Sequence, residues 1–251
     1  MKNVSPRSGW LIGLALVSCS GCATVGVVSK HPDLPQRRAH LRTIAILPPK
    51  VEAYQLTFKG DRQLLDDLTY PIAQSSMEEL HATLAAQGYA TKMFTFSDEH
   101  SREEQAELKR QLSTLHTLLN SRLEERAKRW FPGFHPFTYS LGSDVNLLAD
   151  RTQSDAVVLL QCLGMKKSRG EFTKDLAQSM LISLATLGGV VIVPYGSVTA
   201  VQLAVVDGNT GDILWHADNS ADVAFDIADE KRLRKTLRKM ILKFPKNAPA
   251  H

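Results

Sequence analysis

The sequence predicts an α/β fold, a three-layer sandwich with a mixed central sheet, in which a β-α-β-α-β unit precedes a β-hairpin and a C-terminal helix. Three observations lead to this prediction. Short apolar runs at residues 43–47 and 154–160 have the length and near-continuous apolarity of strands covered on both faces. Leucines recur at helical spacing between these runs. A turn rich in glycine and polar residues, at 207–211, separates two further strand-like runs.

The composition is that of a single globular body. The chain has 251 residues, 43% of them hydrophobic, which is enough for one large core. Its formal net charge of +4 is too small to indicate a nucleic-acid partner. Apart from two cysteines near the N-terminus, the chain has Cys162, which lies in an apolar, strand-like run. We expect this cysteine to be an unreactive core residue.

The N-terminus has the layout of a bacterial lipoprotein signal. Lys2 and Arg7 supply positive charge, and residues 10–17 form an apolar stretch too short to span a bilayer. Small residues then lead to two candidate lipid acceptors. Cys19 has an aliphatic residue three positions before it, whereas Cys22 lies in Ser-Gly-Cys-Ala-Thr, itself a common lipoprotein sequence.

The lipid predicts the location of the protein. The signal peptide ends at residue 18 if Cys19 accepts the lipid, and at residue 21 if Cys22 does. Neither Ser20 nor Ala23, the residues after the two candidates, is the aspartate that typically retains lipoproteins in the inner membrane. Several acyl chains hold a protein stably in a bilayer. We therefore expect an anchor in the periplasmic face of the outer membrane, with an ordinary cleaved signal or an uncleaved anchor as the alternative.

The remaining chain divides into a tether, one domain and a tail. Residues 19–42, the lipidated N-terminus, show no sustained period, which predicts a flexible tether. The folded α/β periplasmic domain is expected over residues 43–245. It carries a helical insertion at about 97–130 and an apolar insertion at about 176–193, and residues 246–251 are expected to be a disordered tail.

The first half of the domain predicts a strand, a helix and a second strand. Residues 43–47 form a short strand ended by Pro48 and Pro49. A helix follows, with Gly88 beyond its end, and residues 89–96 resemble a strand. The apolar face of this helix consists of Leu64, Leu65, Leu68, Ile72, Leu80 and Leu84.

The helical insertion begins with a capping box formed by Ser101 and Glu104. Four leucines then recur with the spacing of a heptad seam. Two heptads are too few for a coiled coil, so we expect this helix to pack on the sheet of its own domain, with a partner helix as the alternative. The aromatic and proline-rich cluster at 130–137 is expected to be a structured loop or an exposed contact. The four leucines are Leu108, Leu112, Leu115 and Leu119.

The second half of the domain predicts a buried strand at 154–160 and a β-hairpin. The hairpin strands, 198–206 and 212–215, flank a turn whose glycines adopt positive φ at low cost. A further strand is expected near 222–227.

The apolar insertion at 176–193 contains no charged residue over a length close to that of a bilayer span. Gly188 and Gly189 divide a half with helix-like content from a β-branched run. One interpretation is a core helix followed by a short strand. The other is a contact with the membrane or with an oligomer partner, and the residues expected to make it are Leu181, Ile182, Leu184 and Leu187.

The chain closes with an amphipathic, basic helix at about 229–244, stopped by Pro245. Helices of this kind bind anionic surfaces such as lipid headgroups. The alternative is a helix docked on the sheet with its basic face in solvent. The residues expected to make an anionic-surface contact are Arg234, Lys235, Arg238 and Lys239.

The sequence contains none of the catalytic motifs that carry a mechanism. It lacks a phosphate-binding loop, a zinc-protease helix, a G-x-S-x-G elbow and an S-x-x-K pair, and its eight histidines are scattered. We therefore predict that the protein is not an enzyme and has no catalytic residue, metal or cofactor. The alternative is a hydrolase whose site is assembled by the fold, with His135, His216 and Asp218 as candidates.

Four sequence features together resemble a known group of proteins. They are the lipoprotein signal, I-A-I-L-P-P at 44–49, S-D-A-V-V-L-L at 154–160 and V-x-L-A-V-V-D-G-N-T-G-D-I-L-W at 201–215. The combination is similar to small bacterial envelope lipoproteins with the fold of the curli-secretion CsgG family, the TolB amino-terminal domain and the lipoprotein activators of penicillin-binding proteins. The D-x-x-T-G-x-x-L-W hairpin is its most specific part.

This resemblance implies a non-enzymatic protein that oligomerises or binds envelope partners. We expect an assembly, scaffold or interaction component of the envelope. The alternative is an oligomeric secretion or export component whose apolar insertion contacts the membrane. A curli-type pore inserts two amphipathic hairpins, whereas residues 176–193 are one continuous apolar segment, so that mechanism is not expected.

Overall fold

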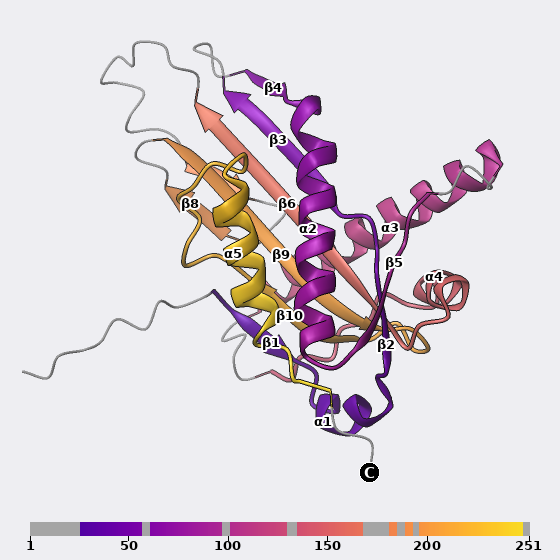
Figure 1. Ribbon diagram of the computed structural model, residues 1–251. Coiled ribbons are helices and arrows are strands. Elements are labelled where there is room, and N and C mark those ends of the chain that lie inside the picture. Colours follow the sequence, from indigo (N-terminus) through magenta and orange to yellow (C-terminus); the bar gives the residue numbers. More distant parts are fainter. Residues whose placement is uncertain are drawn as a thin grey trace, which may run out of the picture.

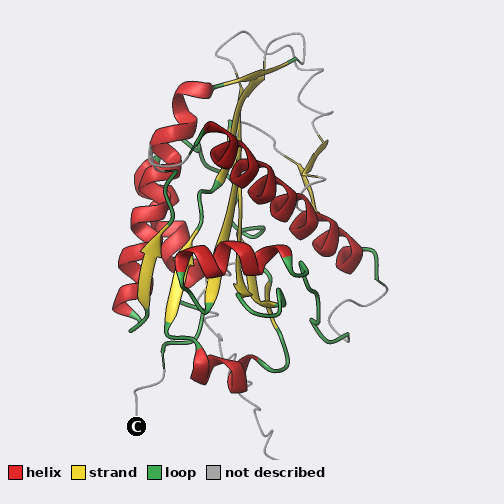
Figure 2. Ribbon diagram, turned by 90° about the vertical axis from the view of Figure 1, so that its right-hand side faces the viewer, coloured by secondary structure: helices red, strands yellow, loops and turns green. Residues whose placement is uncertain are grey.

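A mixed sheet of eight strands lies between two layers of helices in the computed structural model, which describes residues 26–56, 61–96, 101–129, 135–167, 181–184, 189–192 and 196–247 (Figures 1 and 2). Helices α2 and α5 cover one face of the sheet, and α3 and α4 cover the other. The predicted α/β fold with a mixed central sheet is confirmed. The helices are α1 (Leu34–Arg37), the 3-10 turn η1 (Arg38–His40), α2 (Asp66–Ala86), α3 (Arg102–Ala127), α4 (Asp144–Thr152) and α5 (Glu230–Ile241).

The sheet is built around β6, which pairs antiparallel with β9 on one side and parallel with both β2 and β3 on the other. The strand order is β1-β10-β9-β6-β2-β5, and β3 with its partner β4 continues beside β6 where β2 ends. The strands are β1 (Val28–Lys30), β2 (Thr43–Ile46), β3 (Lys50–Leu56), β4 (Arg62–Leu64), β5 (Ala90–Met93), β6 (Ala156–Lys167), β9 (Ser197–Asp207) and β10 (Ile213–Asp218).

Strands β3 and β4 were not predicted from the sequence. The proline pair at 48–49 ends β2 as expected, because proline has no N–H to donate to a ladder. The chain then rejoins the same edge of β6, with Lys50 opposite Gln161. In β3, the buried Val51 and Ala53 alternate with half-buried residues, which is the period-two signal of a strand with one covered face. The predicted apolar helix position Leu64 lies in β4 instead of α2.

The expectation of a free tether up to residue 42 is wrong for the residues from Val28 onward. Strand β1 pairs antiparallel with β10, so that Val28 lies opposite Ala217. Leu34 and Leu41 are buried in the same core as α2 and α5. These apolar residues are too far apart in the sequence to form a period, and they acquire a common environment only when the chain folds back along β10.

The predicted β-hairpin is confirmed as β9 and β10. The carboxylate of Asp207 accepts hydrogen bonds from the backbone N–H groups of Asn209 and Thr210, at 2.9 and 3.1 Å, which closes the turn. Gly211 has a φ of +73°, a conformation that residues with a Cβ rarely adopt. The hairpin of the sequence motif is therefore a structural element whose turn depends on its own polar residues.

The prediction of a strand near 222–227 is wrong. The side chain of Asn219 instead forms hydrogen bonds with backbone groups of β9 that a neighbouring strand would otherwise bind. Its carbonyl oxygen accepts from Val201 N–H at 2.7 Å, and its amide donates to the Thr199 carbonyl at 2.9 Å. These are backbone groups of β9 that lie beyond the end of β10. Phe225 and Ile227 lie in an irregular segment, and their side chains are buried in the core. Their apolar character therefore reflects core packing and not a strand.

The helix expected in the first half of 176–193 is wrong at residues 181–184. Two short strands, β7 (Leu181–Leu184) and β8 (Gly189–Ile192), pair antiparallel with each other, with Leu184 opposite Gly189. Both halves can form hydrogen bonds locally across the glycine-containing connection, whereas an uncharged run of Leu, Ile and Val has no helix-specific period. The β7–β8 pair forms a two-stranded sheet of its own among the described residues.

Helix α3 packs on the sheet of its own domain, as predicted. Its capping box is present, with Ser101 Oγ accepting from Glu104 N–H at 3.2 Å and Glu104 Oε2 accepting from Ser101 N–H at 2.9 Å. Leu108, Leu115 and Leu119 are buried in one core with α4 and the sheet, and Leu112 packs against it. The seam of leucines is therefore satisfied within the domain.

Candidate functional site

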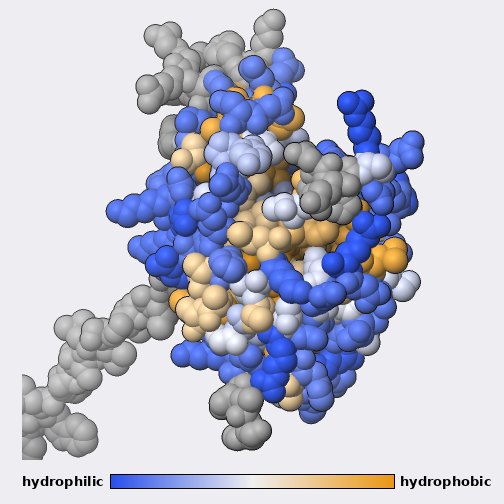
Figure 3. Space-filling view, turned by 45° about the vertical axis from the view of Figure 1, so that its right-hand side comes forward, coloured by the Kyte–Doolittle hydropathy of each residue, from blue (hydrophilic) through white to orange (hydrophobic). Residues whose placement is uncertain are grey.

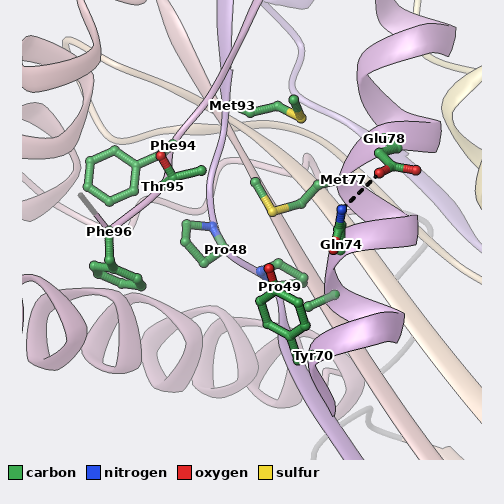
Figure 4. A pocket seen from close by; sticks show the side chains of 11 residues that line it. Pro48, Pro49, Tyr70, Gln74, Met77, Glu78, Met93, Phe94, Thr95 and Phe96 are labelled. Atoms are coloured by element: carbon green, nitrogen blue, oxygen red, sulfur yellow. Dashed lines mark hydrogen bonds between the residues drawn. The ribbon is translucent and has the colours of Figure 1, made fainter. Parts of the chain in front are cut away.

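A hollow of about 520 Å³ lies on the surface between α2 and the edge strand β5. We call it the α2–β5 groove. Its volume falls in the usual range of about 300–1,000 Å³ for ligand pockets. Figure 3 turns this side of the molecule toward the reader and shows hydrophobic side chains gathered between hydrophilic flanks. The apolar walls of the groove are formed by Pro48, Pro49, Met77, Met93, Phe94 and Phe96 (Figure 4).

Three elements position these side chains. Tyr70, Gln74 and Met77 are three to four residues apart on α2, so they lie on one face of that helix (Figure 4). The proline pair between β2 and β3 adds rigid apolar surface opposite them. The N–H of Phe94 donates to the Ile46 carbonyl at 2.9 Å, which keeps the chain beside β2 as it leaves β5.

The aromatic end of the groove is ordered by two ring contacts. Phe94 and Phe96 meet edge to face, with ring centroids 5.7 Å apart. The ammonium group of Lys109, on α3, lies 5.4 Å from the centroid of the Phe96 ring, a cation–π distance. The second contact connects this end of the groove to α3.

The groove is suited to recognising apolar groups. Tyr70 is 75% exposed and Met93 is 46% exposed, so two large side chains with apolar surface are left to solvent beside an apolar wall. Tyrosine is enriched at binding hot spots, and methionine adapts to partners of different shape. The amide of Gln74 donates to Glu78 Oε1 at 3.2 Å, which gives the rim a hydrogen-bonded polar pair.

Sequence reasoning missed this groove. The face formed by Tyr70, Gln74 and Met77 lies beside the core-facing stripe of the same helix, which contains Ile72, Ser76 and Leu80. A second apolar face on a helix that already has a core face is the signal that was available. Only the fold shows that β5 and the proline pair lie against it.

Arg234 and Arg238, two of the four residues expected to contact an anionic surface, are ion-paired to α2. Arg238 binds both carboxylate oxygens of Glu79, at 2.7 and 3.1 Å, and Arg234 Nε lies 3.3 Å from Glu79 Oε2. Burial alone would raise the pKa of Glu79, which is 2% exposed, but hydrogen bonds from Arg238, Thr83 and Arg234 hold it below its ordinary value. Lys235 and Lys239, the other two, are exposed.

Beside the apolar core that α3 shares with the sheet, two sets of polar contacts connect this helix to the sheet. The amide of Gln161 on β6 donates to the His116 carbonyl at 3.0 Å and lies 3.2 Å from the ring nitrogen Nδ1 of His116. Arg126 stacks over the Phe137 ring at 5.0 Å and donates to the Ser29 hydroxyl of β1. Through Arg126, α3 is connected to β1, the edge strand nearest the N-terminus.

The candidate hydrolase residues do not line the α2–β5 groove. His216 is buried behind β1, next to Phe137, and neither of its ring nitrogens has a hydrogen-bond partner among the described residues. Burial lowers its pKa to about 4. His135 is exposed, and Asp218 accepts from the N–H groups of Val27 and Ser220. The structure therefore does not bring the three residues together in a pocket.

Several predicted residues lie outside the part of the chain that the structure describes. Both lipid acceptors, Cys19 and Cys22, belong to this group, as does Leu187 of the apolar insertion. The backbone of Leu181, Ile182 and Leu184 forms β7. Cys162 is a buried free thiol whose pKa burial raises to about 12, as expected for an unreactive core residue.

Within the ranges described above, no group of three or more His, Cys, Asp or Glu side chains is arranged to hold a metal ion. No described helix combines the length and apolar character needed to cross a bilayer.

Comparison with known proteins gives distant structural similarities. No protein-family model matches the chain, and no curated protein matches it in sequence. A PelC dodecamer from Paraburkholderia phytofirmans is 12% identical, with 90% of this chain and 99% of that chain covered and a TM-score of 0.37. Lipoprotein GNA1162 from Neisseria meningitidis is 15% identical, with 70% and 79% covered and a TM-score of 0.28. The C-terminal domain of LpoB from Salmonella enterica is 14% identical, with 71% and 81% covered and a TM-score of 0.27.

Proposed function

We propose that this protein is a lipid-anchored component of the bacterial cell envelope that acts by binding a partner protein, as an assembly or scaffold factor without enzymatic activity. The lipoprotein signal supports the anchor, with Cys19 or Cys22 as lipid acceptor and the periplasmic face of the outer membrane as the location. The α2–β5 groove is the observation that carries the binding role.

The groove supports this role because its apolar wall lies beside two exposed side chains, Tyr70 and Met93, that a partner could bury. A partner that buried Tyr70 and Met93 would gain about 25 cal/mol of favourable free energy for each Å² of apolar surface removed from water. Tyrosine is also among the residues that dominate protein–protein binding energy, and methionine adapts its shape to different partners. The occupant that fits is an apolar or aromatic segment of a partner protein.

Site-specific photocrosslinking in the native host tests this proposal. A photoreactive phenylalanine analogue at position 70 should yield a discrete crosslinked product, which Met93→Glu should abolish. The same analogue at Leu147, which is 51% exposed on α4 on the opposite face of the sheet, is the matched control. Equal products from both positions, or none from position 70, would show that the groove is not the partner site.

A second candidate function is supported by the β7–β8 pair. This hairpin belongs to an uncharged segment and forms a sheet separate from the main one among the described residues. Such a segment favours contact with lipid or with a second copy of the chain, as in an oligomeric export component. This role is tested by measuring the mass of the detergent-solubilised particle for the native chain and for Ile182→Asp. If both particles have the mass of a single copy, an oligomeric role is excluded.

A further inference from the structure

We infer that the exposed lysines of α5 form a contact surface for the anionic phospholipid headgroups of the bilayer that holds the acyl chains. This inference rests on the proposed lipid anchor. The surface, which we call the lysine ridge, consists of Lys231, Lys235, Lys239 and Lys243. The four lysines follow one another at intervals of four residues and are all exposed. Lys231, Lys235 and Lys239 are therefore neighbours along one side of α5, and Lys243 lies in the turn two residues beyond the end of this helix.

The structure separates these lysines from the other cations of α5. Arg234 and Arg238 are turned toward α2, where Glu79 binds both of them. Arg232 pairs with Asp222 at 2.8 Å. In the described part of the chain, none of the four ridge lysines forms an ion pair. The charge that sequence reasoning assigned to the whole helix is therefore concentrated on the ridge.

The acidic residues near the N-terminal end of α5 are already engaged. Asp222 binds Arg232, Glu230 binds Arg234 at 3.0 Å, and Asp226 binds Lys166 at 2.5 Å. Asp229 caps the helix by accepting from the N–H of Arg232 at 3.0 Å. Asp222, Asp226 and Glu230 are therefore paired with cations other than the ridge lysines.

The chain path brings the ridge close to the membrane. Helix α5 packs across β9 and β10, and β10 is the neighbour of the edge strand β1 (Figure 1). At the spacing of adjacent strands, the edge lies within about 10 Å of the strands that α5 covers. The described chain begins at Gly26, which lies against Asp218 and Ser220 at the end of β10.

Only a short connection remains between Gly26 and the lipid. A fully extended chain covers at most about 3.6 Å per residue, so it reaches about 14 Å from Gly26 to Cys22 and about 25 Å to Cys19. A body held this closely, with α5 beside its point of attachment, presents the ridge within reach of the headgroups. Leu242, which is 54% exposed among the lysines, adds apolar surface suited to the interface.

Lysine footprinting of the intact lipoprotein tests the inference. The native, acylated protein is reconstituted into vesicles of phosphatidylcholine, or of phosphatidylcholine and phosphatidylglycerol in equal parts, and is treated with a water-soluble acetylating reagent. Modification at each lysine is measured by mass spectrometry. We expect the ridge lysines to be modified roughly fivefold more slowly in the anionic vesicles, the equivalent of about 1 kcal/mol per residue. The exposed Lys128, which follows the last residue of α3, should not change, and high salt should remove the protection of the ridge lysines.

A pair of variants with matched charge completes the test. Lys235→Gln/Lys239→Gln should weaken the protection of Lys231 and Lys243, whereas Arg102→Gln/Arg151→Gln, which removes the same charge from the opposite helical layer, should not. Equal ridge modification in the two kinds of vesicle, with the acyl chains confirmed by intact mass, would overturn the ridge but leave the anchor in place. A protein that carries no acyl chains would instead overturn the proposed anchor.

Discussion

Arg238 of α5 and Glu79 of α2 form a two-point ion pair, in which Nε lies 2.7 Å from Oε1 and Nη2 lies 3.1 Å from Oε2. The carboxylate is 2% exposed, but the guanidinium side chain is 62% exposed. Removing one partner therefore costs a different amount of stability from removing the other. Removing the arginine leaves a buried charge with fewer donors, whereas removing the carboxylate leaves a cation that water can solvate.

This asymmetry predicts unequal effects of substitution. We expect Arg234→Ala/Arg238→Ala to lower the free energy of unfolding by about 2–3 kcal/mol, and Glu79→Gln by about 1 kcal/mol. Denaturant-induced unfolding, followed by circular dichroism, measures both. Arg110→Ala, which breaks the exposed pair with Glu107 on α3, is the control and should leave stability almost unchanged. Equal losses for Arg234→Ala/Arg238→Ala and for Glu79→Gln would contradict the expected asymmetry.

The pKa values of two buried histidines predict loss of stability in acid. Burial lowers the pKa of both His116 and His216 to about 4, from an ordinary value of 6.5. Above pH 6.5 both are neutral in the folded and the unfolded chain. Below it, the unfolded chain takes up protons first, so stability falls between about pH 6.5 and pH 4, by up to about 3 kcal/mol for each histidine.

His216→Leu separates the contribution of one histidine. This variant should remove part of the decline between pH 6.5 and pH 4 in a series of unfolding curves, because leucine does not titrate. Its stability at pH 7.5 serves as the reference for any packing change. A decline identical to that of the native chain would show that folding does not lower the pKa of His216.

Gly211 in the hairpin turn predicts a strong effect of a single methyl group. Its φ is +73°, and a Cβ at this position would overlap the carbonyl oxygen of Gly142. We expect Gly211→Ala to destabilise the fold by at least about 2 kcal/mol. Gly196→Ala is a matched control, because Gly196 also has positive φ but has open space around it. Thermal unfolding of the two variants distinguishes backbone strain, which they share, from the overlap, which only Gly211→Ala has.

Replacement of the two N-terminal cysteines tests the anchor. Cys19→Ala leaves Cys22 as the only acceptor near the N-terminus, and Cys22→Ala leaves Cys19. Intact-mass spectrometry of each single variant identifies the acylated residue. Cys19→Ala/Cys22→Ala should leave the membrane fraction after a high-salt wash, because the acyl chains supply the anchoring energy. Continued sedimentation of this double variant with membranes would contradict anchoring through these thiols.

Local sequence patterns were sufficient where neighbouring residues satisfy one another. The capping box of Ser101 and Glu104 and the turn of Asp207 depend on partners two or three residues away. The leucines of α3 follow a period that needs only a flat apolar surface to pack on, and the hairpin motif contains its own turn chemistry. For these elements the predicted and the observed structures agree, because the interactions that stabilise them are close in the chain.

Tertiary structure decided the features whose partners are far apart in the chain. β1 became a strand because β10 offered it a free edge, and Asn219 replaced an expected strand by hydrogen-bonding to β9. The groove required α2 to lie beside β5. Among the described residues, α5 has ion-paired arginines and lysines without an ion pair, and this division required Glu79 and Asp222. The sequence by itself determined the fold class and the basic helix, and it predicts the lipid signal. Which charges remain free, and which apolar side chains remain uncovered, depends on long-range packing that no local pattern encodes.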